Sequence, residues 1–477
     1  MTANTSPPGV VVYPAPQGEK LSEDFELKVG SQAVPVYQCR VSAMPFNQVW
    51  PGYQRPLDQT ELASFAYWDL SGPAAVEIVS RRPIESVVVR PLSRGIKPKV
   101  EKNRITFPLP GPAQVTVEVN GTHCALHLFA NPPASAAPDR QAPNVRYFGP
   151  GVHQAGKIVV ESNQTVYLAG GAVVYGAIVA KGASNIRILG RGILDTSRIE
   201  RQNVDHIGGS LQLIDCRDAV IDGIILRDPN AWCLAAFGCS KVSITNVKLI
   251  GLWRYNADGI DVCNCQEVTI RDSFIRSFDD SIVVKGLVAH KDLPVRNVLA
   301  ERCVIWNDWG RALEIGAETC APEINGITFR DCDVIRTMHI ALDLQHGDRA
   351  AVRNVLFENI RVEVDDAYPP PQLQKSREDK YQPKPGNTYC PRLLVVEIVS
   401  TMWSRETVRG TAEKVTFRDI SVTGKLLPGS YLRGFDAEHQ VKGVTIENLR
   451  INGRVIKMLD EAKIGIGPFV ENVRLVP

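Results

Sequence analysis

The chain has 477 residues, of which 44% are hydrophobic and 22% are charged, and its formal net charge is +2. This near balance gives no electrostatic basis for binding nucleic acid or an anionic membrane surface. No apolar run approaches the roughly 20 residues that a membrane-spanning helix needs, so no membrane partner is expected. A chain of this length can hold two or three domains, or one long repeat domain with an added module.

The N-terminal residues and the cysteines bear on the compartment. Residues 1–8 carry neither the basic nor the apolar segment of a secretory signal. This predicts a cytoplasmic protein, or a secreted or periplasmic one whose signal has been removed. The eleven cysteines include no Cys-x-x-Cys pair, which argues against a zinc site and a full disulfide framework. Reduced, buried thiols are expected, and neither a metal nor a cofactor is predicted.

Short strand-like segments separated by Pro and Gly fill the N-terminal region of the chain. Examples are residues 10–13, 87–90 and 115–119. Strands of this kind predict a small β-sandwich. The proline- and alanine-rich stretch 131–138 is typical of a linker. We therefore expect an N-terminal β-sandwich module over residues 1–135 and a second domain over residues 136–477.

The expected second domain is built on a recurring phrase: a polar residue or Gly, then Val-x-Ile or a close relative, usually followed by Asp or Asn. Its anchor residues, which stand 26, 30, 29 and 28 positions apart, are Val242, Val268, Val298, Ile327 and Val355. Such a period, with short strands and almost no helical periodicity, predicts a parallel β-helix. A leucine-rich repeat would need a ladder of Leu and Asn residues, which is missing here. A propeller blade would need about 40 residues or more, which is longer than this period.

A second phrase, small–aliphatic–variable–aliphatic, aligns four coils of this solenoid. Its copies begin at Gly259, Ser281, Ala312 and Ala341. If the first aliphatic residue of each copy points into the core, the next residue points outward, because side chains alternate along a strand. The predicted outward column is Asp261, Val283, Glu314 and Asp343.

Acidic residues gather just before these aligned strands. The residues immediately before the four copies are Asp258, Asp280, Arg311 and Ile340. One position earlier stand Ala257, Asp279, Gly310 and His339. Neighbouring parallel strands lie about 4.8 Å apart, so Asp258, Asp279, Asp280 and Arg311 should share one patch.

Three clustered carboxyl groups suit the hydrolysis of a glycosidic bond. That reaction needs a protonated acid near the leaving oxygen and a carboxylate that activates water or attacks carbon. Asp258 and Asp280 could hold a water molecule while their negative field keeps Asp279 protonated. An arbitrary Asp-Asp pair at a turn is more often solvated or caps main-chain N–H groups. The phase alignment with Asp258 favours the catalytic interpretation here.

The spacing of these acids resembles glycoside hydrolase family 28, the polygalacturonases. Asn256-x-Asp258, followed by Asp279-Asp280 at 21 and 22 residues beyond Asp258, is similar to the active-site pattern of that family. The resemblance covers roughly residues 140–470. It implies a right-handed parallel β-helix that hydrolyses with inversion, in which Asp279 is the general acid and Asp258 and Asp280 position the nucleophilic water.

The front of the chain resembles a related family. Residues 90–98 and 126–132 are similar to the sandwich module that precedes the β-helix in family 49 dextranases, and residues 167–176 to the start of the helix in that clan. Both families imply the same three-Asp inverting chemistry. Polygalacturonases also carry Gly-His-Gly after the Asp pair and Arg-x-Lys for the galacturonate carboxylate, and this sequence has neither. A buried acidic sugar without a cationic partner would be costly, so a neutral or differently charged glycan becomes a plausible substrate.

Seven further residues near the patch are candidates for substrate binding. They are Asn256, Lys285, Arg311, Glu314, His339, Asp343 and Trp309. Lys285 and Arg311 could equally form ion pairs with the acids. Glu314 and Asp343 could equally lie on a face that is exposed to solvent. Trp309 could stack on a sugar ring or pack at a turn of the solenoid. The Pro- and Lys-rich insertion 369–391 is expected to be a loop, and such loops often lie on the binding face.

Two other functions fit the same solenoid. A polysaccharide lyase typically uses a basic proton abstractor and often Ca²⁺, which an Asp trio with one Arg matches less well. In a non-catalytic glycan-binding solenoid the acid cluster would be incidental. The sequence therefore predicts foremost an inverting glycoside hydrolase whose partner is a polysaccharide or oligosaccharide substrate, and it indicates no particular oligomeric state.

Overall fold

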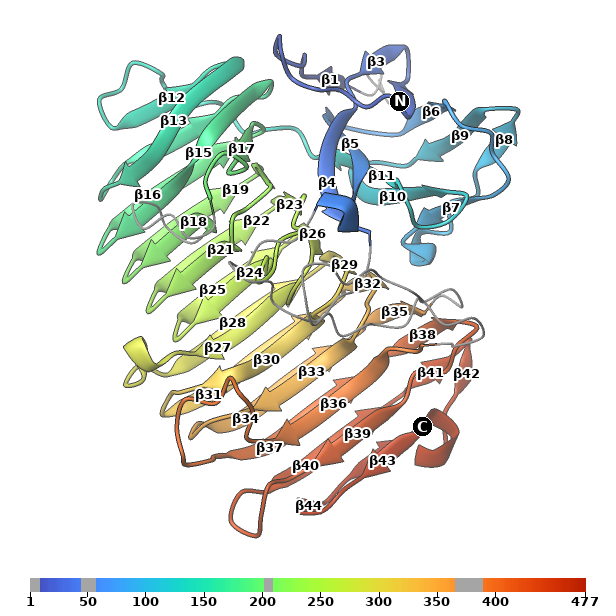
Figure 1. The fold of residues 1–477 in the computed structure, drawn as a ribbon. Helices are drawn as coiled ribbons and strands as arrows, with labels where there is room; N and C mark the ends of the chain where they lie inside the picture. Colours follow the sequence, from blue (N-terminus) through green and yellow to red (C-terminus); the bar gives the residue numbers. More distant parts are fainter. Residues whose placement is uncertain (1–8, 44–56, 201–208, 365–388) are drawn as a thin grey trace, which may run out of the picture.

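The computed structural model describes residues 9–43, 57–200, 209–364 and 389–477. Figure 1 shows a small module of sheets near the N-terminus and a long ladder of strands that runs to the C-terminus. The described residues hold no α-helix. Their 3-10 helices are η2 (Leu57–Gln59), η3 (Leu92–Arg94), η4 (Val288–His290) and η5 (Leu459–Ala462). No helix in these ranges is both long and apolar enough to cross a membrane.

The N-terminal module is a β-sandwich, as predicted. One sheet holds β1 (Val10–Val12), β4 (Tyr37–Ser42), β5 (Thr60–Leu70), β7 (Val87–Arg90), β10 (Ala113–Val119) and β11 (Leu126–Asn131). The other holds β2 (Phe25–Val29), β3 (Gln32–Val34), β6 (Ala74–Ser80), β8 (Lys99–Glu101) and β9 (Arg104–Leu109). Apolar side chains from both sheets, such as Ile78, Ile105, Trp68 and Val117, form one buried core. Burial of alternate residues between two sheets is what holds such a module together.

From Val145 onward the chain is a parallel β-helix, which confirms the predicted fold class. One sheet of parallel strands comprises β12 (Val145–Phe148), β14 (Thr165–Leu168), β16 (Ser184–Gly190), β19 (Arg217–Asp222), β22 (Ser240–Thr245), β25 (Gln266–Arg271), β28 (Val295–Glu301), β31 (Glu323–Arg330), β34 (Ala351–Glu358), β37 (Thr411–Arg418), β40 (Val441–Glu447), β44 (Val470–Glu471) and β45 (Arg474–Val476). The sandwich ends at Asn131, and the division at residues 135 and 136 stays a prediction.

The remaining strands of the β-helix form two further columns. The short strands are β17 (Ile193–Asp195), β20 (Ile225–Arg227), β23 (Lys248–Ile250), β26 (Phe274–Ser277), β29 (Val304–Asn307), β32 (Asp333–Arg336), β35 (Arg361–Val364), β38 (Ser421–Gly424) and β41 (Arg450–Ile451), with β42 (Arg454–Val455) paired antiparallel to β41. The other column, whose strands are mostly longer, holds β13 (Gly151–Val160), β15 (Ala172–Lys181), β18 (Gly209–Ile214), β21 (Trp232–Phe237), β24 (Ile260–Cys263), β27 (Ile282–Gly286), β30 (Arg311–Thr319), β33 (Ile340–His346), β36 (Arg392–Ile398), β39 (Ser430–Arg433) and β43 (Ile464–Ile466).

The register between coils is the one that the repeats predict. Each anchor residue pairs with the next, from Val242 through Val268, Val298 and Ile327 to Val355. The second phrase also stacks as expected, because Ile260, Ile282, Leu313 and Leu342 occupy paired positions. Residues 369–388 of the predicted insertion lie outside the described residues. All eleven cysteines are free, and nine of them are buried, among them Cys216, Cys233, Cys303 and Cys332, which agrees with the expected buried thiols.

Stacked side chains inside the coils carry much of the packing. Phe357 lies between Phe329 and Phe417, with ring centroids 5.0 and 4.9 Å apart, and all three rings are fully buried. Aromatic pairs at such distances add to the free energy gained from burial alone.

Truncating the middle ring of this stack should therefore be costly. We expect Phe357→Ala to lower the free energy of unfolding by about 3–5 kcal/mol, because it removes a buried ring and leaves a cavity. Urea denaturation followed by fluorescence measures this change. Val476→Ala is the control, since Val476 is 43% exposed. Equal effects of the two substitutions would contradict the packing role.

The sandwich packs directly on the β-helix. Tyr37, Phe65 and Phe129 of the sandwich form one buried cluster with residues of the short strands, among them Phe274 and Trp306. Buried ion pairs also join the sandwich to the β-helix: Arg191 Nε lies 2.9 Å from Asp69 Oδ1, and Arg227 Nη1 lies 2.6 Å from Glu19 Oε1. An interface of apolar side chains and compensated charges fixes how the module sits against the solenoid.

Candidate active site

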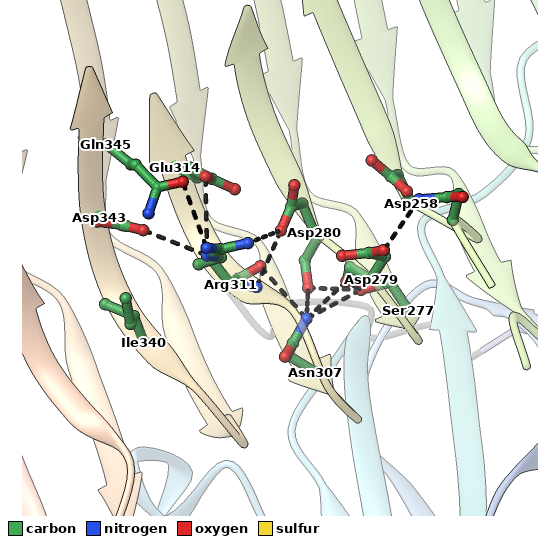
Figure 2. A network of polar contacts seen from close by, with 12 residues as sticks. Asp258, Ser277, Asp279, Asp280, Asn307, Arg311, Glu314, Ile340, Asp343 and Gln345 are labelled. Carbon is green, nitrogen blue, oxygen red and sulfur yellow. Dashed lines mark hydrogen bonds and ion pairs between the residues drawn. The ribbon is translucent and has the colours of Figure 1, made fainter. Parts of the chain in front are cut away.

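The three aspartates come together where the short strands β23, β26 and β29 turn into the long strands. Because Leu234, Ile260, Ile282 and Leu313 are paired across β21, β24, β27 and β30, the residues two positions earlier stand at equivalent places on successive coils. Those residues are Trp232, Asp258, Asp280 and Arg311. Asp279 lies one position before Asp280, and Figure 2 shows its carboxyl group between those of Asp280 and Asp258. The predicted patch therefore exists.

The turn that carries Asp279 and Asp280 is tied to the next coil. Asn307, fully buried at the end of β29, donates from Nδ2 to the main-chain oxygen of Asp279 over 2.7 Å. The same nitrogen lies 3.3 Å from Ser277 Oγ and 3.2 Å from Ser281 Oγ. Gly310 passes so close that a Cβ there would lie 2.5 Å from the carbonyl carbon of Asp279. Buried hydrogen bonds and this close approach hold the two carboxyl groups in place (Figure 2).

Lys285 joins the acids from β27. Its Nζ lies 3.1 Å from Asp258 Oδ2, 3.2 Å from Asp261 Oδ1 and 3.8 Å from Asp280 Oδ2. The ammonium also stands 4.3 Å from the ring centre of Trp232. Lys285 is 4% exposed, and the neighbouring carboxylates raise its pKa well above the ordinary value despite burial. The ion pair, which was one of two interpretations of Lys285, is what the structure contains.

Arg311 is the second cation of the site. Its main-chain N–H donates to Asp280 Oδ1 over 3.1 Å, and its guanidinium lies 3.7 Å from the same oxygen. The guanidinium also faces Asp343 at 3.4 Å and Glu314 at 3.8 Å, as Figure 2 shows. Arg311 therefore spans three carboxyl groups on three coils.

The surroundings of Asp279 and Asp280 shift the pKa values of these two residues in opposite directions. Burial, together with the adjacent charge of Asp280, raises the pKa of Asp279 to about 6. Burial also acts to raise the pKa of Asp280, but the Arg311 guanidinium and the Lys285 ammonium hold it below its ordinary value. Burial raises the pKa of Asp258 against the opposing charge of Lys285. Two neighbouring carboxyl groups with pKa values moved in opposite directions are suited to act as acid and base.

These groups line a cavity of about 510 Å³. Asp279 is its most accessible aspartate, since it is half-buried, whereas Asp258 is 2% and Asp280 6% exposed. Of the predicted residues, those that line the cavity are Asn256, Asp258, Asp279, Asp280, Lys285, Trp309, Arg311 and His339. Its size suits a small number of sugar rings held with most of their surface covered.

Asn256, Trp309 and His339 lie on the wall of this cavity. Asn256 Nδ2 donates to Asp279 Oδ2 over a long 3.4 Å. The rings of Trp309 and His339 stack with centres 5.6 Å apart and an angle of 15° between them. Burial and the charge of Arg311 lower the pKa of His339 to about 3, so its ring is neutral near pH 7. The stacked pair offers a flat apolar surface of the kind that sugar faces contact.

Glu314 and Asp343 require a correction. Both were expected on an outward column, in contact with sugar or with solvent, but both are fully buried and neither lines the cavity. Asp261, on the same column, is fully buried beside Lys285. Burial raises the pKa of Asp343 to about 7 and that of Glu314 well above its ordinary value. Among the described residues, Arg311 links both carboxyl groups to the cavity, and Glu314 also forms a hydrogen bond with Asp280.

The cavity also contains residues that the sequence interpretation missed. Trp232 and Tyr255 line it together with Glu318, Met402 and Trp403. Trp232 precedes Asp258 by one coil at the same register, so extending the alignment backward would have found it. Met402 and Trp403 lie between β36 and β37 in a segment that does not follow the repeat. The sequence pattern therefore does not indicate that these two residues reach the cavity.

One group of possible metal ligands lies elsewhere in the described residues. Ligand atoms of Cys320, Asp348 and Glu406 lie within 4.8 Å of one another. Asp348 already accepts three main-chain hydrogen bonds, from Thr319, Arg405 and Glu406. Burial and the nearby carboxylates raise the pKa of the Cys320 thiol, which keeps it protonated. The three main-chain hydrogen bonds make Asp348 the centre of a turn-closing network.

Comparison with known proteins finds similar sequences and a similar fold. Residues 161–370 match the sequence model of Glycosyl hydrolases family 28. The "Probable rhamnogalacturonase B" of Aspergillus terreus is 26% identical over 149 residues, which are 31% of this chain and 26% of that protein. "Rhamnogalacturonase A" of Aspergillus niger is 26% identical over the same length, which is 31% of each chain. The matched segment thus spans less than a third of these relatives.

A solved structure matches almost the whole chain. It is Dex49A from Penicillium minioluteum, with a TM-score of 0.69 and 16% identity over 98% of this chain and 96% of that one. At this identity the likeness concerns the fold, which includes the N-terminal module as well as the β-helix.

Proposed function

We propose that this chain, a family 28-like protein with a dextranase-like fold, is an inverting glycoside hydrolase that acts on a polysaccharide or oligosaccharide. The observation that carries the proposal is that Asp279 and Asp280 lie next to each other in one cavity, where the pKa of Asp279 is raised and that of Asp280 is lowered. The family match and the rhamnogalacturonase relatives support hydrolysis of a glycosidic bond. The three-Asp mechanism is our inference from the geometry.

In the proposed reaction Asp279 donates its proton to the leaving glycosidic oxygen. Its partial exposure in the cavity and its pKa of about 6 suit a general acid that is still protonated in mildly acidic solution. Asp280, ionised beside Arg311 and Lys285, accepts a proton from the attacking water. Asp258, on the preceding coil, holds the same water. Attack from the face opposite the leaving group inverts the anomeric centre.

The charges of the cavity favour a neutral sugar at the point of cleavage. Among its described lining residues the cations are Lys285 and Arg311, and both already face several carboxylates. Asp258, Asp279, Asp280 and Glu318 contribute acidic groups to the same wall. A uronate carboxylate placed there would add a charge that these cations do not balance. We therefore propose a neutral glycan rather than galacturonan as the substrate class.

Proton NMR of the first product tests both the mechanism and the substrate class. Wild-type protein is incubated with dextran, with other neutral plant and microbial glycans, and with polygalacturonate and rhamnogalacturonan. We expect a new reducing end from a neutral glycan, with an anomeric configuration opposite to that of the cleaved bond. A retained configuration would contradict the mechanism, and cleavage of polygalacturonate alone would contradict the substrate class. An unsaturated product would identify a lyase instead.

A further inference from the structure

A turn between strands β36 and β37 places two apolar side chains on the wall of the cavity that holds the three aspartates. The N–H of Ser404 donates to the main-chain oxygen of Thr401 over 3.2 Å, which closes a four-residue turn. Met402 and Trp403 are its two central residues, and both line the cavity. The turn lies beyond residues 161–370, which match the family model, so the family match does not account for it.

The two central residues are unusual for their position in a turn. Exposed turns favour Gly, Pro, Asn, Asp and Ser, whose conformations or side-chain hydrogen bonds suit the backbone there. Met402 is 81% exposed, more than any other large apolar side chain among the described residues, and Trp403 is 37% exposed. Apolar side chains left in water contribute little to folding. Two of them at the tip of a turn, on the wall of a cavity, are therefore better explained by contact with a ligand.

The segment that follows the turn is held in place by buried hydrogen bonds. Asp348, fully buried, accepts the main-chain N–H groups of Arg405 and Glu406 at Oδ1, over 2.7 and 2.8 Å. The buried guanidinium of Arg409 donates to the main-chain oxygen of Glu406 over 2.8 Å. The Arg405 guanidinium lies 5.9 Å from the ring centre of Trp403. A surface that is fixed in this way loses little conformational entropy when it binds a ligand.

The turn stands toward the opposite end of the cavity from the aspartates. Strand β30 crosses the cavity, with Arg311, which contacts the aspartates, at its start and Glu318 near its end. Glu318 Oε1 lies 3.9 Å from Nη2 of Arg405, the residue that follows the turn. The register between β27 and β30 shifts here, so that residues 316–318 stand opposite Lys285 alone. Arg311 and Glu318 are therefore about five strand steps, or roughly 15 Å, apart. A sugar ring on the turn thus belongs to a different sugar from the one at the aspartates.

We infer that Met402 and Trp403 form a platform that binds a sugar ring of the glycan chain away from the bond that is cleaved. For the identity of this ligand the inference rests on the proposed function. The apolar face of a sugar ring packs on an indole ring, and the flexible Met side chain adapts to the atoms beside it. Trp309 and His339 give a second flat surface near the aspartates. Contacts at both ends of the cavity hold an extended chain across the aspartates, so the platform favours long substrates over short ones.

Calorimetric titration of the full chain tests the platform. The Asp279→Asn protein, chosen so that the ligand is not degraded, is titrated with dextran, a mixed-linkage β-glucan, galactomannan and polygalacturonate. Trp403→Ala is added to remove the indole, and Trp403→Phe to keep a flat ring. Val408→Ala is the matched control, because Val408 is 58% exposed in the same segment but is not among the residues that line the cavity. Thermal unfolding checks that each variant remains folded. The same substitutions in the wild-type protein are assayed for kcat and KM on the glycan that it cleaves.

We expect Trp403→Ala to weaken the binding of a neutral glycan about five- to tenfold, and Trp403→Phe and Val408→Ala to change it by less than about twofold. KM on the glycan should rise by the same factor in Trp403→Ala, with kcat nearly unchanged. The inference is overturned if Trp403→Ala binds every glycan as its parent does, if Val408→Ala weakens binding equally, or if no glycan binds the parent. Binding that depends on Trp403, without release of reducing ends by the wild-type protein, would contradict only the proposed enzyme function.

Discussion

Asp279→Asn should lower kcat on a natural glycan by about 10²- to 10⁴-fold, the usual contribution of a positioned general acid. Asparagine keeps the shape of the side chain but has no proton to give to the leaving oxygen. Because Asp279 lines the cavity without being an anchor of the fold, KM and the unfolding temperature should change little. Initial rates of reducing-end release measure the effect. The exposed Asp218→Asn is the matched control, since Asp218 does not line the cavity and has a backbone φ of 53° that asparagine also accepts.

The choice of substrate makes this experiment specific for the acid. An aryl glycoside with a good leaving group needs little protonation, so Asp279→Asn should lose far less activity on it than on the natural glycan. Asp280→Asn should lose activity on both, because water activation is needed for both. The fall of wild-type kcat/KM above about pH 6, where Asp279 loses its proton, should disappear in Asp279→Asn. Equal losses on both substrates would remove Asp279 from the role of acid.

The sequence repeat predicts most of the features that bring the aspartates together. Side chains alternate along strands and coils stack at a fixed spacing, so the equivalence of Asp258, Asp280 and Arg311 follows from the positions of aliphatic residues. Trp232 belongs to the same series, one coil earlier. Met402 and Trp403 reach the cavity from a segment without repeat phase, and only tertiary packing brings such a segment to a particular wall.

Burial is the property that strand phase does not predict. Asp261, Glu314 and Asp343 point outward from their sheet, as expected, yet none is exposed to solvent. Alternation decides which face of the sheet a side chain leaves, but not what covers that face. Here Lys285 lies beside Asp261, and the Arg311 side chain extends to Glu314 and Asp343. Cations that seemed candidates for binding substrate are thus largely used to compensate buried acids.

Lys285→Met should move the activity of the enzyme to higher pH. The ammonium lies 3.8 Å from Asp280 and 3.1 Å from Asp258, and it lowers the pKa values of Asp258, Asp279 and Asp280. Without it these pKa values rise, so the base needs a higher pH to ionise and the acid keeps its proton to a higher pH. One charge at about 4 Å corresponds to a shift of roughly one to three pH units. The pH dependence of kcat/KM measures both limbs of the profile.

Two matched variants separate this electrostatic role from a structural one. Lys285→Arg keeps the positive charge and should keep both limbs near their wild-type pH. Asp261→Asn removes a negative charge 3.2 Å from the ammonium and should move the limbs to lower pH, opposite to Lys285→Met. Removing one partner of a buried ion pair also costs about 3–5 kcal/mol of stability, so Lys285→Met should unfold at lower temperature. If Lys285 had only a structural role, Lys285→Met would lower stability and activity without moving either limb of the pH profile. Opposite shifts in Lys285→Met and Asp261→Asn would mean that Lys285 sets the protonation of the three aspartates.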